Sequence, residues 1–527
     1  MTRLAPASVN RSIAAEIWYS PGGSAADSAA RWAIRLHRGA FPALVEVAAE
    51  DGPPHVGLGP TDREPVSSLC LATKTYDRAE TLVCRAAHAG TDLSACLNLP
   101  YPFGVAKNNV RTDARGPVPE IATVASSHLL WLLGPALVAG VAYLDPGNVA
   151  SNMTAGARYG YLLVWVVVAG NVMAWLIQYL SAKLGIVTGT SLPEILGVRI
   201  RRPLTRRLYW VQAELVAMAT DLAEIIGGAV ALNLLFGLPL LAGGVITGVI
   251  SMIVLTVQTR RGPRTFERVI VALLLIITVG FAAGVFFAPP DAGSVVAGLV
   301  PRFEGANSVL LAASILGATI MPHAIYAHSA LTRDRFPVVA DGAATRRLLW
   351  ATKWDVTIAM AIAGTVNLSI LLLAASALQG VAGTDTLEGA HAALEATLGP
   401  VIATVFAVGL LASGLASTSV GAYAGAEIMH GLLHVRVPLL ARRVVTLIPA
   451  LLILSVGFDP TEALVLSQVV LSFGIPFALI PLVWLTMQRG VLGEHVNRWY
   501  TTVAGAVCAL LLVALNVVLL VLVFTGA

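Results

Sequence analysis

Two short motifs, each inside a long apolar stretch, carry groups that could bind a cation. Residues 145–148 read Asp-Pro-Gly-Asn, and residues 321–323 read Met-Pro-His. Proline cannot donate a backbone hydrogen bond, so it leaves the helix carbonyl four residues earlier without a partner. These carbonyls belong to Ala142 and Ala318. Free carbonyls at membrane depth are tolerated where they line a cavity, which favours a binding site at both interruptions.

The side chains beside these carbonyls indicate the kind of cation. Asp145 and Asn148 offer hard oxygen atoms, whereas Met321 offers a soft thioether sulfur. Mixed hard and soft ligands suit Mn²⁺, Fe²⁺, Co²⁺ or Cd²⁺ and suit Mg²⁺ or Ca²⁺ poorly. Each group also has a simpler interpretation, since Pro-Gly often ends a helix and a buried Met usually packs. The combination of two polar interruptions favours the site.

A second group of residues could carry protons. One apolar stretch contains Glu214, Asp221 and Glu224, of which the last two share a helix face. Acids in a membrane helix are costly unless they are paired or functional, and they often mark proton relays. Arg442 and Arg443 could neutralise these acids, so a purely structural ion-pair network is the alternative.

Polar residues near the motifs could support either role. His323 follows the second proline directly, and imidazole, with an ordinary pKa of about 6.5, is a natural proton acceptor. His328 could support the site from behind or cap its helix at the membrane interface. Asn171 and Gln178 lie seven residues apart on one helix face, where they could line an entry or bond one helix to another.

The composition indicates that membrane helices position these residues. Apolar residues make up 57% of the 527 residues, charged residues make up 12%, and the mean hydropathy is +0.78. The apolar residues fall in blocks near the ~20 residues that a helix needs to cross ~30 Å of hydrocarbon. We predict an all-α membrane protein with eleven spans, near residues 127–148, 160–182, 208–236, 238–258, 268–288, 308–331, 354–378, 399–429, 443–457, 462–487 and 500–524.

The two motifs fall in the first and sixth of these spans, which have opposite orientations. Interrupted helices at corresponding positions of two halves predict a five-plus-five inverted repeat with a site at the midplane. The eleventh span is then an addition outside the repeat. The ninth span is short, so the two arginines at its start must snorkel or lie within protein.

Lysine and arginine are distributed unevenly among the predicted loops. One alternate set of loops carries twenty of them, and the opposite set carries only Arg158 and Arg302. The positive-inside rule places the basic set in the cytoplasm, with the N-terminus cytoplasmic and the C-terminus extracytoplasmic. The lack of a recognisable targeting sequence suggests the plasma membrane.

Residues 1–125 differ from the transmembrane domain, residues 126–527. They are mixed in charge and rich in Ala, Gly and Pro, which predicts a cytoplasmic extension with little order. The four cysteines of the chain show neither metal-site spacing nor the density of a disulfide framework. The chain has no Walker sequence, which argues against an ATP-driven pump. Nothing indicates a cofactor, a nucleic acid or an obligate protein partner.

The two motifs together resemble the paired signatures of the Nramp family of proton-coupled divalent metal ion transporters, of the bacterial manganese and iron type. The resemblance covers residues 126–527 and implies a LeuT-like fold with a site between unwound helices 1 and 6. The metal ligands that it implies are Asp145, Asn148, Met321, the carbonyls of Ala142 and Ala318, and Gln468, which matches a residue that approaches the metal in some states. Relatives that move magnesium or aluminium differ at the Met position, so Met321 indicates the transition-metal type.

The resemblance also implies a polar path for protons from the site to the cytoplasm. The positions that match this path are Asp145, His323, Glu224, Asp221 and Arg443. The expected function is symport of Mn²⁺ or Fe²⁺ with protons, by a multi-pass protein whose partners are the ion, the proton and the lipid bilayer.

Three other functions are alternatives to transport of a metal ion. An organic-solute transporter of the same architecture would favour small residues and helix N-termini around a carboxylate, whereas Asp with Met fits a cation better. A metal-sensing receptor or a channel would share the site but not a saturable, pH-dependent flux. A membrane-embedded enzyme would need a ligand set such as HExxH, which is missing from the sequence. We therefore expect a secondary transporter and not an enzyme.

Overall fold

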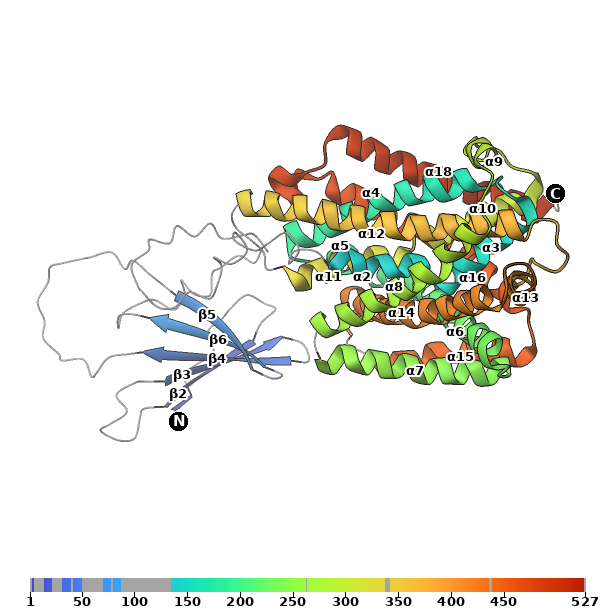
Figure 1. Cartoon of the computed structure of the whole chain (residues 1–527). Coiled ribbons are helices and arrows are strands. Elements are labelled where there is room, and N and C mark those ends of the chain that lie inside the picture. Colours follow the sequence, from blue (N-terminus) through green and yellow to red (C-terminus); the bar gives the residue numbers. More distant parts are fainter. Residues whose placement is uncertain are drawn as a thin grey trace, which may run out of the picture. The chain divides into compact units, whose positions relative to one another are not determined.

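The computed structural model describes residues 134–261, 263–336, 342–435 and 438–525, together with six strands nearer the N-terminus. The chain divides into two units, Met1–Pro117 and Val118–Ala527. In the first unit the strands form one sheet in the order β1-β2-β3-β4-β6-β5, in which only β4 and β6 pair in parallel (Figure 1). These strands are β1 (Thr2–Arg3), β2 (Ala14–Ser20), β3 (Arg31–Arg38), β4 (Phe41–Ala49), β5 (Cys70–Tyr76) and β6 (Ala79–Ala86). The cytoplasmic extension predicted for residues 1–125 stays a prediction.

The second unit is a bundle of helices, and its described residues contain no strand (Figure 1). Its first half comprises α2 (Pro135–Val141), η3 (Ala142–Leu144), α3 (Pro146–Tyr159), α4 (Val164–Thr188), α5 (Leu192–Arg199), α6 (Pro203–Phe236), α7 (Leu240–Arg261) and α8 (Pro263–Phe287). Its second half comprises α9 (Ala292–Ala297), α10 (Gly305–Thr319), α11 (Pro322–Arg335), α12 (Gly342–Ala377), α13 (Leu387–Leu398), α14 (Pro400–Leu433), α15 (Leu439–Val456), α16 (Pro460–Thr486), α17 (Arg489–Leu492), η4 (Gly493–His495) and α18 (Trp499–Thr525). The all-α prediction for the transmembrane domain is confirmed.

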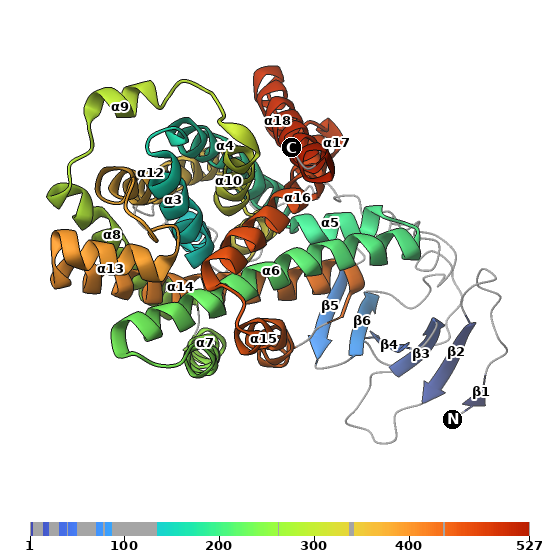
Figure 2. The ribbon, with the colours of Figure 1, turned by 90° about the vertical axis from the view of Figure 1, so that its right-hand side faces the viewer.

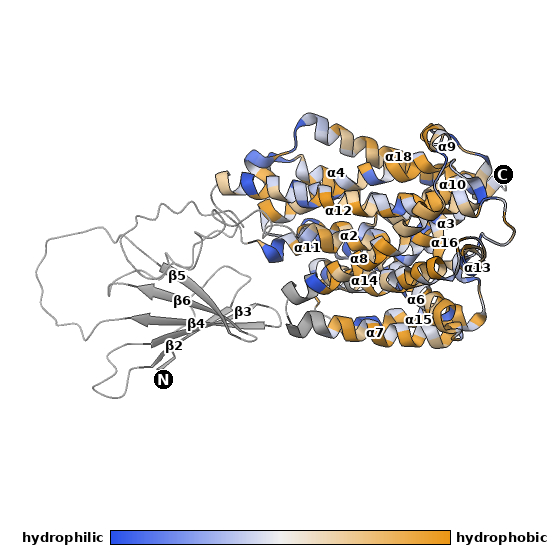
Figure 3. Ribbon diagram, in the orientation of Figure 1, coloured by the Kyte–Doolittle hydropathy of each residue, from blue (hydrophilic) through white to orange (hydrophobic). Residues whose placement is uncertain are grey.

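The helices of the second unit have the lengths and the composition of membrane spans. Eight of them, within the described residues, are long and apolar enough to cross a membrane, and two shorter apolar helices accompany them. Figure 3 shows apolar residues along the outer helices α7 and α18 and hydrophilic residues gathered near helix ends. The prediction of a multi-pass membrane protein is confirmed, whereas the count of eleven spans stays a prediction.

Both predicted interruptions are present. The first separates η3 from α3 at Asp145, and the second separates α10 from α11 at Ile320 and Met321. The predicted first span, residues 127–148, is wrong at its C-terminal end, because the helix resumes at Pro146 and continues to Tyr159. Proline is well tolerated in the first turn of a helix, where its missing N–H has no partner to lose. The first interruption therefore lies between two helical segments and not at the end of a span.

Glycines allow the helices around the interruptions to approach closely. In Figure 2, α16 passes between α10 and α6, and it also packs against α3 and α11. A Cβ atom on Gly147 would lie 1.8 Å from Nε2 of Gln468, and a Cβ atom on Gly317 would lie 1.9 Å from the carbonyl oxygen of Gln468. On the other side of α3, a Cβ atom on Gly227 would lie 2.0 Å from Cβ of Pro146. Because these glycines have no side chain, α6 can pack closely against α3, and α16 can pack closely against α3 and α10.

Candidate metal site

Asp145 occupies the break in the first interrupted helix. Its backbone is extended, and its Oδ1 accepts a hydrogen bond from the N–H of Asn148 at 2.9 Å, as the cap of α3. Its Oδ2 accepts a hydrogen bond from Nε2 of Gln468 at 2.9 Å. The residue is fully buried, and the positive end of the α3 dipole favours a carboxylate there. The carboxylate is thus held by neutral donors from two helices.

Asn148 joins the two interruptions to each other. Its Nδ2 donates to the carbonyl of Ala318, at 3.1 Å, and to the carbonyl of Tyr143. Its Oδ1 accepts a hydrogen bond from Nδ2 of Asn152 at 3.0 Å. The carbonyl of Ala318 is the one that Pro322 leaves without a helical partner, so the structure brings this predicted group to Asn148.

Met321 and Ala142 lie at the same two breaks and are fully buried. Hydrogen bonds link Asp145 with Asn148 and Gln468, and Asn148 with Ala318. In the described part of the chain, no three His, Cys, Asp or Glu side chains are grouped as they would be in a metal centre rich in charged ligands. A cation at the breaks would therefore be held by one carboxylate together with neutral oxygen and sulfur atoms.

A cavity of about 460 Å³ opens at one end of this site. It is lined by Thr154, Arg158, Asn307, Leu310, Leu311, Asp385, Thr386, Asp459, Thr461, Glu462, Val465 and Leu466. Ser151 and Ser314 share a hydrogen bond one turn nearer the site, and Oγ of Ser314 also donates to the carbonyl of Val465 at 3.1 Å. This layer of hydrogen bonds, which we call the serine layer, separates the cavity from Asp145.

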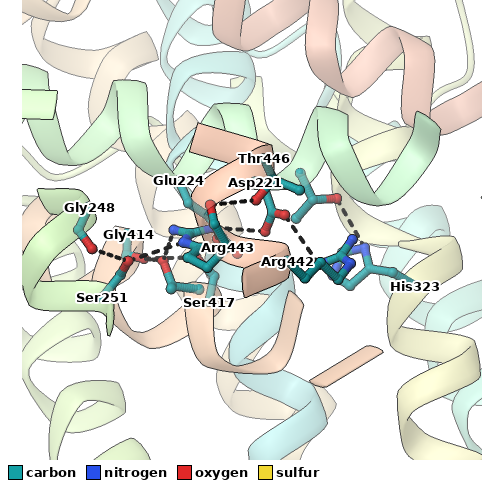
Figure 4. A network of polar contacts seen from close by, with 12 residues as sticks. Asp221, Glu224, Gly248, Ser251, His323, Gly414, Ser417, Arg442, Arg443 and Thr446 are labelled. Atoms are coloured by element: carbon teal, nitrogen blue, oxygen red, sulfur yellow. Dashed lines mark hydrogen bonds and ion pairs between the residues drawn. The ribbon is translucent and has the colours of Figure 1, made fainter. Parts of the chain in front are cut away.

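The predicted acids and arginines form one network, of which Figure 4 shows Asp221, Glu224, Arg442 and Arg443. Nη1 of Arg443 lies 2.8 Å from Asp221 and 3.2 Å from Glu224, and all three side chains are fully buried. Nη1 of Arg442 lies 3.3 Å from Asp221, and its Nη2 lies 2.9 Å from Glu214. The prediction that α15 supplies the charges that neutralise the acids of α6 is confirmed, and both arginines lie within protein rather than snorkelling.

The two histidines have separate surroundings. Nδ1 of His323 lies 3.1 Å from Oγ1 of Thr220, the residue before Asp221, so His323 contacts the helix that carries the acids. Nδ1 of His328 lies 2.6 Å from Oε1 of Gln178, and Nε2 of Gln178 donates to the hydroxyl of Tyr143. Gln178 therefore links α4 to α11 and to η3. Through Gln178, His328 stabilises the first break, and it does not cap a helix at the interface.

A partly buried ion cluster, centred on Arg333, lies at the opposite end of the bundle from the cavity. Nη1 of Arg333 lies 2.9 Å from Glu194 and 3.1 Å from Glu427, which joins α11 to α5 and α14. Burial acts to raise the pKa of Glu194, but hydrogen bonds from Ser191 and Arg333 outweigh burial and hold that pKa below its ordinary value. Ser191 and Glu194 also form a capping box at the start of α5.

The sequence did not point to several polar residues that shape the site. Tyr143 offers its carbonyl to Asn148 and to Nδ2 of Asn367, and Oγ of Ser413 donates to the carbonyl of Leu144. Asn367 is the only amide side chain in the apolar stretch 354–378, which was the available signal, whereas Ser413 is one of several hydroxyl residues in its stretch. Asn152 was missed because the first span was ended at residue 148.

Comparison with known proteins decides the family. A family model for natural resistance-associated macrophage protein-like proteins, Nramp, matches residues 136–522. The chain belongs to the Nramp family. Divalent metal cation transporter MntH of Mycobacterium tuberculosis (strain CDC 1551 / Oshkosh) is 61% identical over 396 residues, which cover 75% of this chain and 92% of that protein. MntH of Bacillus subtilis (strain 168) is 49% identical over 396 residues, with coverage of 75% and 92%.

A solved Nramp structure has the same architecture. The crystal structure of a mutant of the Eremococcus coleocola manganese transporter is 31% identical, has a TM-score of 0.68, and covers 76% of this chain and 88% of that chain. The predicted family and the LeuT-like fold are thereby confirmed. The named Nramp relatives are transporters, which also confirms the prediction of a transporter and not an enzyme.

Proposed function

We propose that this chain takes up divalent transition-metal ions such as Mn²⁺ and Fe²⁺ together with protons, by alternating access in the plasma membrane. The observation that carries the proposal is that Asn148 joins two interrupted helices through the carbonyl of Ala318, beside the buried carboxylate of Asp145. Relatives named divalent metal cation transporters support the class of substrate.

The proposed metal ligands are Asp145, Asn148, Met321, Gln468 and the carbonyls of Ala142 and Ala318. An arriving cation would take the place that Nε2 of Gln468 holds at Asp145. The Oε1 atom of Gln468 is buried and has no hydrogen-bond partner within the described residues. Because buried oxygens are normally satisfied, a rotation of this amide that presents Oε1 to the cation is favourable. Gln468 would then pass from a hydrogen-bond donor to a ligand.

Met321 would give the site its preference among divalent ions. A thioether stabilises Mn²⁺, Fe²⁺ or Cd²⁺ but replaces water poorly around Mg²⁺ or Ca²⁺, which require oxygen ligands. One carboxylate also leaves a bound divalent ion with a net positive charge. Such a charge in a buried site disfavours a proton at Asp145, so a proton held there would move on toward the acids of α6 when the ion binds.

The proposed proton path comprises Asp145, His323, Glu224, Asp221, Glu214, Arg442, Arg443 and His328. Three carboxyl groups in the α6–α15 network face two guanidinium groups, so one carboxyl group has no guanidinium of its own. The Oε1 atom of Glu224 and the Nε2 atom of His323 are buried and, among the described residues, have no hydrogen-bond partner. At these two atoms, and at Oε2 of Glu214, which is likewise buried and without a hydrogen-bond partner among the described residues, a proton could be added or removed without breaking an ion pair.

The proposed orientation follows from the basic loops, whose Lys and Arg residues would face the cytoplasm. The cavity beside the serine layer would then face the outside, and the Arg333 cluster would face the cytoplasm. Metal would enter through the cavity, bind at the two breaks and leave past α11. The proton gradient and the membrane potential would drive the cycle.

The test is uptake of radioactive manganese by purified protein in liposomes that contain a pH-sensitive dye, at acidic and at neutral external pH. We expect acid-stimulated, saturable uptake with acidification of the lumen, and we expect loss of uptake in Asp145→Asn. In Met321→Ala we expect Ca²⁺ and Mg²⁺ to compete with Mn²⁺, which they do not do in the wild type. A correctly folded preparation without manganese flux would contradict the proposal, and competition by an amino acid would favour an organic substrate.

A further inference from the structure

A second hollow, away from the metal site, lies between α4, α12 and the start of α18. It has a volume of about 690 Å³, and we call it the basic groove. It is lined by Val172, Met173, Trp175, Leu176, Tyr179, Lys183, Arg346, Leu349, Trp350, Lys353, His495, Val496, Arg498, Tyr500, Thr501, Ala504 and Cys508. Figure 1 shows α4, α12 and α18 together along one side of the bundle. The proposed metal and proton routes use none of these residues.

The groove is basic at one end and apolar at the other. Lys183, Asn497 and Arg498 lie at one end, where Nζ of Lys183 is 3.0 Å from Oδ1 of Asn497. Eleven residues separate Lys183 from Val172 on α4, which is about 16 Å at 1.5 Å per residue. Cys508 lies at a corresponding depth on α18, eleven residues from Asn497. The apolar part is therefore about half of the ~30 Å hydrocarbon thickness, which is the depth of one lipid leaflet.

The charged end of the groove is lined by basic side chains. None of the residues that line the groove is Asp or Glu. Within the described residues, no carboxylate forms an ion pair with Arg346, Lys353 or Arg498. Nη1 of Arg498 instead lies 3.0 Å from the hydroxyl of Tyr500. This end of the groove thus presents an excess of positive charge.

Aromatic residues stand between the charged and the apolar parts. The ammonium group of Lys353 lies 5.8 Å from the centre of the Trp175 ring, whose Nε1 donates to Oγ1 of Thr357 at 2.9 Å. Trp350, which also lines the groove, remains 54% exposed. Trp and Tyr are enriched at the level of lipid headgroups, so these rings place the charged end at the membrane surface.

We propose that the basic groove binds an anionic glycerophospholipid. The phosphate would lie among Arg346, Lys353 and Arg498, and one acyl chain would run along the apolar part toward Val172 and Cys508. Basic pockets between membrane helices are the sites at which anionic headgroups bind, and the groove matches both ends of such a lipid. A bound lipid would join α4 and α12 to α18. This inference does not rest on the metal ion or on the proposed direction of transport.

The test is native mass spectrometry of the purified full chain, titrated in detergent with phosphatidylglycerol or, in parallel, with phosphatidylcholine. We expect saturable binding of phosphatidylglycerol and at least tenfold weaker binding of phosphatidylcholine. The triple variant Arg346→Gln, Lys353→Gln, Arg498→Gln removes three basic side chains, each worth roughly fivefold in binding near an anionic headgroup. We expect it to bind phosphatidylglycerol at least tenfold more weakly than the wild type.

The matched control removes three other exposed arginines, in the variant Arg201→Gln, Arg207→Gln, Arg489→Gln, and should stay within twofold of the wild type. Ala504→Trp fills the apolar part and leaves the charge unchanged, so it should also weaken binding. Equal binding of the two lipids, equal losses in both triple variants, or unchanged binding in Ala504→Trp would overturn the proposal. Displacement of the lipid by an equal concentration of inorganic phosphate would also overturn it, because the site would then recognise a free anion.

Discussion

Replacing Gly147 by alanine tests whether the Gln468 amide shapes the metal site. A Cβ atom at position 147 would lie 1.8 Å from Nε2 of Gln468 and 2.5 Å from its Cδ, so the amide must move away. Once it moves, it can no longer donate to Asp145. The substitution therefore perturbs the site without changing a proposed ligand.

The expected cost follows from these contacts. A lost hydrogen bond to a charged group costs about 1.5–3 kcal/mol, and overpacking adds roughly 1–3 kcal/mol. Gln468→Ala removes both the obstruction and the donor, so the double variant Gly147→Ala, Gln468→Ala should be no less stable than Gln468→Ala alone. Gly317→Ala is the matched control, because its Cβ atom would meet the backbone oxygen of Gln468, which no side-chain substitution removes.

The assay is denaturant unfolding of the purified variants, combined into two double-mutant cycles, with initial manganese uptake rates alongside. We expect a coupling energy above about 1 kcal/mol between positions 147 and 468, and below about 0.5 kcal/mol between positions 317 and 468. Equal coupling in both cycles, or a Gly147→Ala variant with wild-type stability and uptake, would refute the reasoning.

Three further predictions concern charged groups. Arg443→Met leaves Glu224 without a guanidinium partner and Asp221 with Arg442 alone. It should destabilise the protein by about 3–5 kcal/mol in denaturant unfolding, with part of the loss restored by adding Glu224→Gln. A loss unaffected by the second substitution would contradict this. The pKa of Glu194 is lowered in the folded state, so its contribution to stability is complete above its ordinary pKa of 4.5 and is lost as the pH falls below that value. The stability difference between wild type and Glu194→Gln should therefore shrink on acidification, and a constant difference would exclude the Arg333 pairing as its cause. Arg158→Gln removes an exposed ion pair and should change the unfolding free energy by less than about 1 kcal/mol.

The sequence predicted the breaks more accurately than the extent of the helices around them. Proline and glycine determine local backbone geometry, so both interruptions could be placed to within a residue. The helix after Asp145 was missed because residues 148–159 include Asn148, Ser151, Asn152 and Thr154, which lower the hydropathy of that segment. These residues are tolerated there because they hydrogen-bond to neighbouring helices and carbonyls, which hydropathy does not record.

The charged part of the site was predicted well, and the neutral part less well. Glu214, Asp221 and Glu224 required counter-charges inside an apolar bundle, and Arg442 and Arg443 were the available candidates. Contacts such as Gln178 with Tyr143 depend on the register between helices. That register is set where glycines let two helices approach closely. The sequence of one helix does not show how it is aligned with its neighbour.

The serine layer and the Arg333 cluster close the two ends of the protein with unequal strength. Parting Ser314 from Val465 breaks a neutral hydrogen bond, worth roughly 1 kcal/mol, whereas moving α11 away from α5 and α14 separates a guanidinium group from two carboxylates. A difference of about 1.4 kcal/mol changes a population tenfold. Under the proposed alternating access, the protein without a bound ion should therefore populate the state that is open on the cavity side more than the state that is open at the Arg333 cluster.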